Sequence, residues 1–216
     1  MVEEGNESYI QSECRDDAYP STQVRKKRIV EKKKDSEAIK QRVDEYPILT
    51  ASIDKTSTPY NELVQYYCTD WDFILSRAEA NGLIVTTDRK DILVKKPEVN
   101  AKAKLKVTYG MDLILFKGEL IAEEQPDGIK ATAWDLSKQE IISIEATKPS
   151  LNKQGKDSPA DLAKAVGNNK QCCQTDLCAD NASLQAWADA QLLRTGLSRI
   201  RGHCKFTGNH QLLPGD

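Results

Sequence analysis

Three cysteines that lie close together, Cys172, Cys173 and Cys178, are the residues of this sequence whose type and spacing could do chemistry. With Cys204 or His203 brought in by the fold, they would offer four ligands for a tetrahedral Zn²⁺ ion. However, adjacent cysteines point apart, the usual spacing of two to four residues between ligands is missing, and no second cysteine pair is present. The pattern therefore favours structural or incidental thiols, with a disulfide or a zinc site as the alternatives.

Acid–base catalysis has few candidates in this sequence. The only histidines are His203 and His210, and the residues around His203 are typical of the face of a short strand. Acidic pairs at positions 16–17 and 123–124 lie in polar stretches typical of solvated turns. The sequence contains no phosphate-binding glycine loop and no GxSxG or HExxH motif. We therefore predict that the protein is not an enzyme, and we predict no catalytic residue, cofactor, bound metal or small-molecule substrate.

The strongest local charge is the basic run RKKRIVEKKK at residues 25–34, which holds seven positive side chains. Such a run could bind phosphates with salt-dependent affinity. No aromatic side chain interrupts the run to stack on nucleic-acid bases, and the acidic remainder of the chain cancels its field. We interpret it as a solvated strand face, or as a patch that meets an acidic neighbouring subunit.

The composition is that of an evenly charged globular chain. Its 216 residues suffice for one large or two ordinary domains, and 30% charged against 39% hydrophobic residues give a net charge of −2. This balance gives no reason to expect nucleic acid or an anionic membrane as a partner. Neither a run of 18 apolar residues nor an N-terminal signal pattern is present, so we expect reduced thiols and a cytoplasmic location before any export.

The N-terminal part of the chain predicts two strands and one helix. The strands, Tyr9–Cys14 and a basic one within residues 22–34, need further strands as partners, because lone hairpins are marginally stable in water. A short helix follows over residues 35–46, with Asp35 as its cap. Its predicted apolar face consists of Ile39, Val43 and Tyr46.

The stretch from residue 61 to 82 changes from a strand pattern to a helix pattern at a cysteine. Glu62–Tyr67 is rich in β-branched and aromatic residues, which favour a strand. Thr69 and Asp72 have the spacing of a capping box, which predicts a helix over Asp70–Asn81 that ends at Gly82. The predicted apolar stripe of this helix is Trp71, Ile74, Leu75 and Ala78.

Hairpins dominate the predicted middle of the chain. One hairpin pairs Leu83–Thr87 with Asp91–Lys95. Strands are then predicted within residues 105–110 and 112–123. A second hairpin at residues 129–147 alternates apolar and polar residues, as in a larger antiparallel sheet or barrel.

Two helices are predicted in the last third of the chain. Ser158 and Asp161 have capping-box spacing, so a helix is expected to begin there and to end near Gly167. Residues 168–181, which include the cysteine cluster, are predicted to form a loop. The longest helix is predicted over Ser183–Ile200.

The order of these segments resembles that of the VgrG and Rhs element Vgr spike proteins of type VI secretion and related contractile injection systems. The similarity extends over nearly the whole chain, which makes it more specific than a single motif. It is carried by ECRD (13–16), KDSEAI (34–39), LVQYYCTDWDFILSRAEANGLIV (63–85), LKVTYG (105–110), ATAWDLSKQEIISIEAT (131–147), LQAWADAQLLRTGLSRIRGHCKFTG (184–208) and PGD (214–216).

The resemblance implies an α+β fold that is mainly β, with the small β-barrels of a phage baseplate hub and α/β insertions. It divides the chain into an incomplete first barrel at 1–100, with an α/β insertion at about 35–96, and a second barrel at 101–216, with a helical insertion at about 150–200. Relative to the family, the chain is expected to be truncated at both ends, without the first half-barrel, the tip domain and the needle.

The resemblance also implies a function and partners. The protein would be the structural hub portion of a VgrG-like spike that connects the tube to the puncturing tip. It would be a homotrimer that contacts tube and baseplate proteins, with effector cargo as a further partner, and the contractile apparatus would export it without a signal peptide. Trp71 and Phe73 would anchor the insertion, and Trp134 and Trp187 would lie in the barrel core or ring contacts. The alternative is a zinc-stabilised or nucleic-acid-binding accessory protein.

Overall fold

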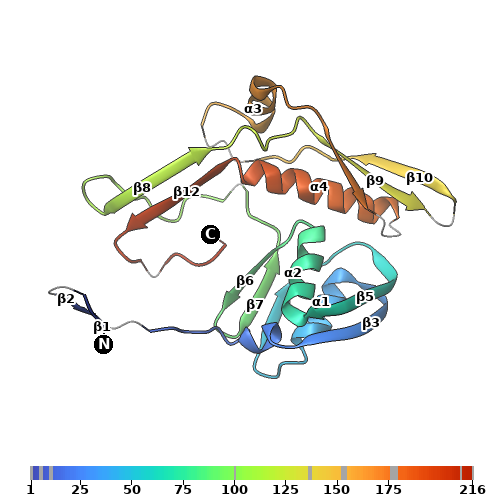
Figure 1. Ribbon diagram of the computed structural model, residues 1–216, viewed down its shortest axis with the longest axis horizontal. Helices are drawn as coiled ribbons and strands as arrows, with labels where there is room; N and C mark the ends of the chain where they lie inside the picture. The colour runs from blue at the N-terminus through green and yellow to red at the C-terminus, as the bar shows by residue number, and fades with distance from the viewer. Residues whose placement is uncertain are drawn as a thin grey trace.

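The chain folds into two α/β units that follow each other along the sequence (Figure 1). The first unit spans residues 25–95 and the second spans residues 113–206. A short N-terminal hairpin of β1 (Val2–Glu4) and β2 (Glu7–Tyr9) precedes them. The computed structural model describes residues 2–4, 7–9, 12–99, 101–135, 138–151, 155–175, 180–209 and 211–215.

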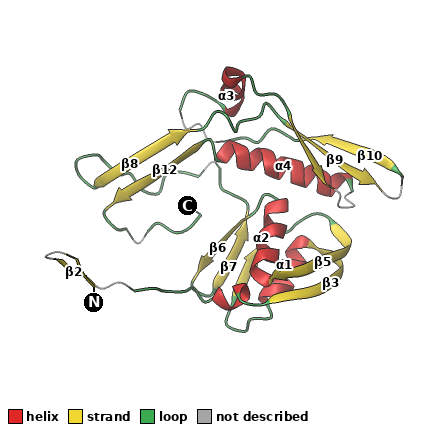
Figure 2. Cartoon of the chain, viewed as in Figure 1, coloured by secondary structure: helices red, strands yellow, loops and turns green. Residues whose placement is uncertain are grey.

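The first unit combines a two-stranded ribbon, a three-stranded sheet and two helices (Figure 2). Its elements are β3 (Arg25–Lys34), α1 (Asp35–Val43), β4 (Thr50–Ile53), β5 (Pro59–Thr69), α2 (Asp70–Ala80), β6 (Ile84–Asp88) and β7 (Asp91–Lys95). The ribbon pairs β3 with β5 in antiparallel orientation. In the sheet β7 is central, with β4 parallel to it on one side and β6 antiparallel on the other.

Two clusters of buried side chains hold this unit together. The larger cluster lies between the helices and the three-stranded sheet, and it includes Ile39, Ile74 and Val94. Leu63 and Phe73 belong to a smaller cluster between the helices and the β3–β5 ribbon. Full burial of such a side chain contributes about 1.5–3 kcal/mol. The two helices are therefore fixed from two sides.

The bounds of α2 confirm the prediction from its local signals. Thr69 is the N-cap and accepts a hydrogen bond from the Asp72 backbone N–H at 3.0 Å. Gly82 adopts a left-handed φ of 67° after the last turn. The apolar stripe differs from the prediction, because Leu75 is 38% exposed whereas Phe73 is only 4% exposed. The β3–β5 ribbon packs on a second side of the helix, and helical periodicity does not predict that contact.

The cap of α1 differs from the prediction by one residue. Lys34 is the N-cap and Asp35 is the first helical residue. The Glu37 carboxylate accepts a hydrogen bond from the Lys34 backbone N–H at 2.9 Å. The Asp35 carboxylate is consequently available for a partner in the interior, which is Arg77 of α2.

The second unit carries one long helix over a three-stranded sheet, with a separate two-stranded ribbon. Its elements are β8 (Leu113–Leu120), β9 (Ile129–Asp135), β10 (Glu140–Glu145), α3 (Pro159–Val166), β11 (Gln171–Thr175), α4 (Asn181–Leu197) and β12 (Ile200–Phe206). The sheet order is β10–β9–β11, and the ribbon pairs β8 with β12. Helix α4 covers β9 and β10, as Figure 1 shows, and Ala131, Ile142 and Leu184 are buried between them.

Helix caps in this unit follow the sequence. Ser158 and Asp161 form the predicted capping box, and Gly167 ends α3 with a left-handed φ of 78°. Helix α4 begins after its cap Asp180, whose side chain accepts from the Ser183 backbone N–H. Among the residues that the structure describes, no helix is long and apolar enough to cross a membrane.

Helices α2 and α4 join the two units. Arg194 of α4 forms an ion pair with Glu79 of α2. Gly82 lies so close to α4 that a Cβ at this position would be 3.3 Å from the Ala190 Cα. Gly82 therefore serves both the end of α2 and the contact between the units.

Three predicted elements are wrong. The strand predicted at Tyr9–Cys14 ends at Tyr9, and residues 12–14 have no regular structure. Residues 105–110 form no strand, apart from one bridge between Tyr109 and Leu113. The predicted loop at 168–181 contains β11, which pairs in parallel with β9. In each case the pairing partner, and not the local pattern, decides whether a strand forms.

The α+β, mainly β class is confirmed, whereas a closed barrel is not observed in the described ranges. Each sheet there has two or three strands and free edges, and a barrel needs a neighbour on both sides of every strand. Trp134 is 45% exposed and so is not in a core of the single chain, and its place in ring contacts between subunits stays a prediction. Trp187 packs against the cluster beneath α4.

We expect Ile74→Ala to lower the free energy of unfolding by about 3 kcal/mol, because the side chain is fully buried between α2 and the sheet. Leu75→Ala, on the exposed side of the same helix, should cost about 1 kcal/mol or less. Urea unfolding followed by tryptophan fluorescence, with Trp71 as a reporter within α2, measures both. Equal losses for the two variants would contradict this assignment of the core.

Candidate functional site

The β8–β12 ribbon is the most exposed apolar element of the second unit. Its strands pair antiparallel from Ile200 opposite Leu120 to Phe206 opposite Leu113. No third strand joins either edge within the described residues. The large apolar side chains on it that are at least partly open to solvent are Ile114 (61%), Leu115 (41%), Phe116 (65%), Leu120 (55%) and Ile200 (39%).

Glycines allow the two strands of this ribbon to approach closely. Gly118 and Gly202 lie directly opposite each other. A Cβ at Gly202 would overlap the carbonyl oxygen of Lys117, and one at Gly118 would lie 2.9 Å from the Phe116 ring. A paired glycine in a strand often marks such a close approach. The close pairing of the two strands therefore depends on these glycines. The edges of the ribbon and its apolar side chains are exposed.

A buried carboxylate, Asp70, organises the first unit. It is the first residue of α2 and is fully buried. Its carboxylate accepts hydrogen bonds from Tyr46 Oη at 2.6 Å and Gln65 Nε2 at 2.9 Å, and it pairs with Lys26. Burial alone would raise the pKa of Asp70, but these donors outweigh it and hold the pKa below its ordinary value. Burial and the neighbouring carboxylate raise the pKa of the Tyr46 hydroxyl.

A second buried carboxylate, Asp35, links the two helices. Arg77 Nε donates to Asp35 Oδ1 at 2.5 Å and Arg77 Nη2 to Oδ2 at 3.1 Å. Asn81 Nδ2 donates to the same carboxylate at 2.7 Å, and the Arg77 guanidinium lies 5.0 Å from the centre of the Tyr60 ring. Every polar group here has a structural partner. Both carboxylate clusters therefore connect elements of the fold through hydrogen bonds and ion pairs.

The cysteines and histidines singled out in the sequence lie in different sheets. Cys172 is exposed and Cys173 half-buried on β11, and burial raises the pKa of the Cys173 thiol. Cys204 and His203 are on β12, which pairs with β8 and not with β11. Cys178 and His210 lie outside the described residues. In the part of the chain that is described, no group of three or more His, Cys, Asp or Glu side chains could hold a metal ion.

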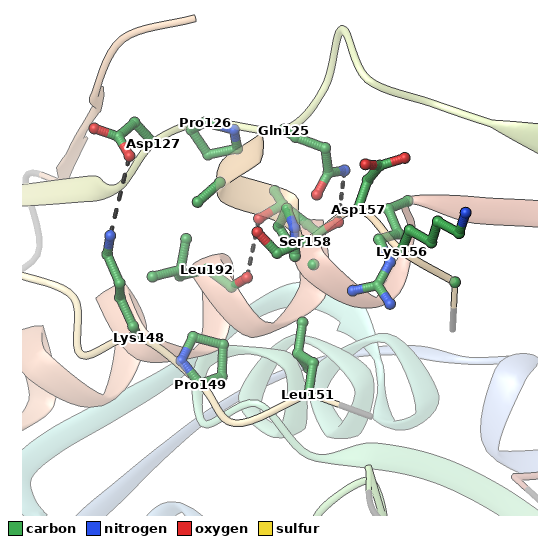
Figure 3. A pocket seen from close by; sticks show the side chains of 16 residues that line it. Gln125, Pro126, Asp127, Lys148, Pro149, Leu151, Lys156, Asp157, Ser158 and Leu192 are labelled. Atoms are coloured by element: carbon green, nitrogen blue, oxygen red, sulfur yellow. Dashed lines mark hydrogen bonds and ion pairs between the residues drawn. The ribbon is translucent and has the colours of Figure 1, made fainter. Parts of the chain in front are cut away.

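A cavity of about 340 Å³ lies between α3, α4 and the loop before β9 (Figure 3). Its wall is largely apolar, and Gln125 Nε2 at its edge donates to the Thr195 carbonyl at 2.9 Å. Lys148 pairs with Asp127 at 4.0 Å on one side. The described lining residues include no histidine or cysteine, and the Ser158 hydroxyl bonds Asp161 in the helix cap. The Ser158 hydroxyl is therefore engaged in capping α3.

The basic run at residues 25–34 becomes β3, and its side chains divide between two faces of the ribbon. Lys26 and Arg28 turn inward and form ion pairs with Glu45. Lys27 stays exposed beside Tyr66 of β5. The run itself contains no aromatic residue, and the pairing of β3 with β5 brings Tyr66 beside it. The sequence predicts a strand with tyrosines at Glu62–Tyr67, but no local pattern predicts that this strand pairs with the basic one.

The family follows from comparison of the sequence with known families. A family model described as the Alg8 N-terminal domain matches residues 1–216. The chain belongs to the Alg8 N-terminal domain family. No curated protein matches the sequence of this domain.

Solved tail proteins share the fold of this Alg8 N-terminal domain. The 43 kDa tail protein of prophage MuSo2 from Shewanella oneidensis aligns over 90% of this chain and 54% of its own, with 10% identity and a TM-score of 0.55. The tail protein from Neisseria meningitidis MC58 aligns over 82% of this chain and 52% of its own, with 12% identity and a TM-score of 0.52. The domain thus spans about half the length of these proteins, and at such identity the likeness establishes the fold alone.

We expect Asp70→Asn to lower the free energy of unfolding near neutral pH by about 2–4 kcal/mol, because Lys26 loses its buried counter-charge. The folded-state pKa of Asp70 lies below its unfolded value of about 3.9. Its contribution is therefore complete above the unfolded pKa and is lost as the pH falls through the folded pKa. The difference between the wild type and the variant should shrink in acid, which urea unfolding at a series of pH values measures.

Asp44→Asn is the matched control for this experiment. Asp44 pairs with Lys40 on the exposed surface of α1, where the two side chains are 57% and 60% exposed. Such a pair contributes about 0.5 kcal/mol or less. If Asp70→Asn lowered the free energy of unfolding no more than Asp44→Asn does, the supporting role of Asp70 would be wrong.

Proposed function

We propose that this member of the Alg8 N-terminal domain family is the structural hub portion of a VgrG-like spike in a contractile injection machine. There it connects the tube to the puncturing tip. The proposal is supported most by the β8–β12 ribbon, which is apolar, exposed and open on both edges in a chain whose fold is similar to phage tail proteins. An element with these properties is a stable part of a protein only when other strands cover it.

The strands that cover the ribbon are proposed to come from other copies of the chain and from adjoining parts of the spike. Burial of side chains such as Ile114 and Phe116 contributes about 2 kcal/mol each, which favours association over exposure. Obligate interfaces of this kind bury roughly 2,000 Å² or more, so one ribbon face alone does not suffice. A homotrimer, in which each copy contributes ribbon and sheet edges to a ring of small barrels, provides that area.

The proposed mechanism is mechanical, and the protein acts without catalysis or a cofactor. Contraction of the sheath supplies the free energy, and the hub transmits force between tube and tip through its interfaces. Stiffness is what this task requires, and the buried carboxylate clusters of the first unit provide it: Asp70 fixes α2 to β3 and β5, and Asp35 fixes the two helices to each other. The hub is assembled in the cytoplasm with tube and baseplate proteins, and the apparatus then carries it out with any effector cargo.

We expect this chain to form a trimer in solution, with three times 24.2 kDa giving about 73 kDa. Size-exclusion chromatography with light scattering, with and without a chelator, measures the mass. Phe116→Asp places a charge on the exposed ribbon and should shift the trimer to monomers. Ile48→Asp, at a side chain that is 50% exposed in the first unit, serves as the control and should leave the trimer intact.

Two outcomes would count against the hub proposal. A monomer at every concentration tested would show that this chain does not build the ring. A mass that changes with the chelator would instead support the zinc-stabilised alternative that the cysteines suggest.

A further inference from the structure

A tight turn before β8 presents two large apolar side chains to solvent. Tyr109 is 84% and Met111 85% exposed. The turn is held by its own hydrogen bonds: the Thr108 carbonyl accepts from the Met111 backbone N–H at 3.2 Å, and the Thr108 N–H donates to the Asp112 carboxylate at 2.5 Å. Gly110, between the two apolar residues, has a left-handed φ of 82°. Both side chains are therefore presented by a turn of defined backbone shape.

This turn, defined as residues 108–112 and called the knob, lies at the opposite end of the β8–β12 ribbon from the cavity of Figure 3. The knob precedes Leu113, which pairs with Phe206 at the end of β12. Arg199, which lines the cavity, precedes the start of β12 at the other end of the ribbon. The 7 residues of β12 span about 20 Å at the usual rise of a strand. The knob therefore lies too far from the cavity of its own copy to enter it.

The cavity contains a buried hydrogen-bond acceptor without a donor. Gln125 is fully buried, and its side chain points from the loop before β9 toward α4 (Figure 3). Its Nε2 donates to the Thr195 carbonyl, whereas its Oε1 has no partner among the described residues. An acceptor left in this state costs about 1–3 kcal/mol. Leu151 and Leu192 line the same space, so the cavity fits an apolar group that carries one donor.

The charges around the cavity do not select an ion. Asp127 and Lys148 pair with each other at 4.0 Å. Lys156 and Asp157, which are adjacent in the chain, are both exposed. Arg199 is buried and has an interaction partner of its own. Because positive and negative charges on the rim balance, a neutral group is favoured over a charged one.

The knob supplies a group with this chemistry. A tyrosine side chain is an apolar ring with one O–H donor at its far end, and a methionine side chain adapts to irregular spaces. The cavity volume of about 340 Å³ is at the lower end of ligand sites, about 300–1,000 Å³, which suits one or two side chains. The charges nearest to Tyr109 and Met111 are Lys106 and Asp112, which have opposite signs and match a balanced rim.

We propose that the knob of one copy inserts Tyr109 and Met111 into this cavity of a neighbouring copy, where the Tyr109 hydroxyl donates to Gln125 Oε1. The contact joins two different surfaces, so it repeats head to tail, and it gives a ring when the rotation between copies closes. This inference deepens the hub proposal and rests on it, because it names the contact through which neighbouring copies of the chain associate.

The area of the knob makes it one part of a larger interface. At their exposures Tyr109 and Met111 bring on the order of 300 Å² of side-chain surface, and a stable interface buries about 800 Å² on each partner. The exposed Ile114 and Phe116 follow the knob directly along β8 and continue its apolar surface. The knob therefore sets the specificity of the contact, and the ribbon supplies further area.

Photo-cross-linking tests this contact in the full chain. Tyr109 is replaced by the photoreactive amino acid p-benzoylphenylalanine, and this variant is mixed with heavy-isotope-labelled wild type. Mass spectrometry should then find position 109 joined to labelled peptides that contain Leu151 or Leu192, which proves a contact between copies. The same replacement at Tyr66, which is 76% exposed on the β3–β5 ribbon, is the matched control and should give no cross-link to the cavity.

A double-mutant cycle tests the hydrogen bond. Tyr109→Phe removes only the hydroxyl and should weaken the association measured by sedimentation velocity about 3- to 10-fold. In the Gln125→Met background the same change should have no effect, because the acceptor is absent. Combined Tyr109→Ser and Met111→Ser should weaken association at least about 100-fold, because the burial of two apolar side chains is lost. Tyr66→Phe, the control, should associate like the wild type.

Two results would overturn the proposal. The first is a set of cross-links from position 109 that never reaches the cavity lining of another copy. The second is a loss on Tyr109→Phe that is the same with and without Gln125. A trimer that gives the first result would leave the hub proposal standing, whereas cross-linked copies that build no trimer would contradict the hub and leave this contact. A chain that remains monomeric at every concentration would contradict both.

Discussion

The buried carboxylate of Asp70 is the interaction on which the first unit depends. It stands at the first position of α2 and collects donors from β3, from the segment after α1 and from β5. A buried charge without these donors would destabilise the fold by several kcal/mol. The elements that meet at Asp70 therefore stabilise one another. Asp35 has the same role at the start of α1, where it accepts from Arg77 and Asn81 of α2.

The bulge at Tyr67 is connected to this constraint. Strand β5 continues into α2 without a loop, and Thr69 both ends the strand and caps the helix. Gln65 must face inward to donate to Asp70, and Thr69 and Asp70 must also be buried. One extra residue, Tyr67, lies in β5 between Gln65 and Thr69, so Cys68 is opposite Lys26 and both Tyr66 and Tyr67 remain exposed. The exposed tyrosines therefore lie directly between the residue that donates to Asp70 and the cap of α2.

The second unit differs from the first because part of its apolar surface stays exposed. Helix α4 covers the β9–β10 hairpin and completes a small core, while the β8–β12 ribbon has no third strand at either edge in the described residues. It combines closely approaching paired glycines with exposed apolar side chains. A chain with one closed core and one open ribbon is suited to an assembly whose other members supply the missing strands.

Short-range features of this protein are determined by the sequence itself. The Thr69–Asp72 cap, the Ser158–Asp161 capping box, the glycine at 82 and the hairpin strands around residues 129–145 follow from residues within a few positions of each other. Their hydrogen bonds and preferred dihedral angles need no distant partner, so propensity and spacing suffice to predict them.

Only the tertiary structure decided which distant segments meet. Parallel pairing made strands of β4 and β11, the ribbon buried Phe73 in place of Leu75, and β5 brought tyrosines beside the basic run. The candidate surfaces, which depend on what stays uncovered after folding, were equally hidden in the sequence. The physical reason is that a strand's partner lies far along the chain, 41 positions away for β4 and 42 for β11, and no local pattern encodes that distance.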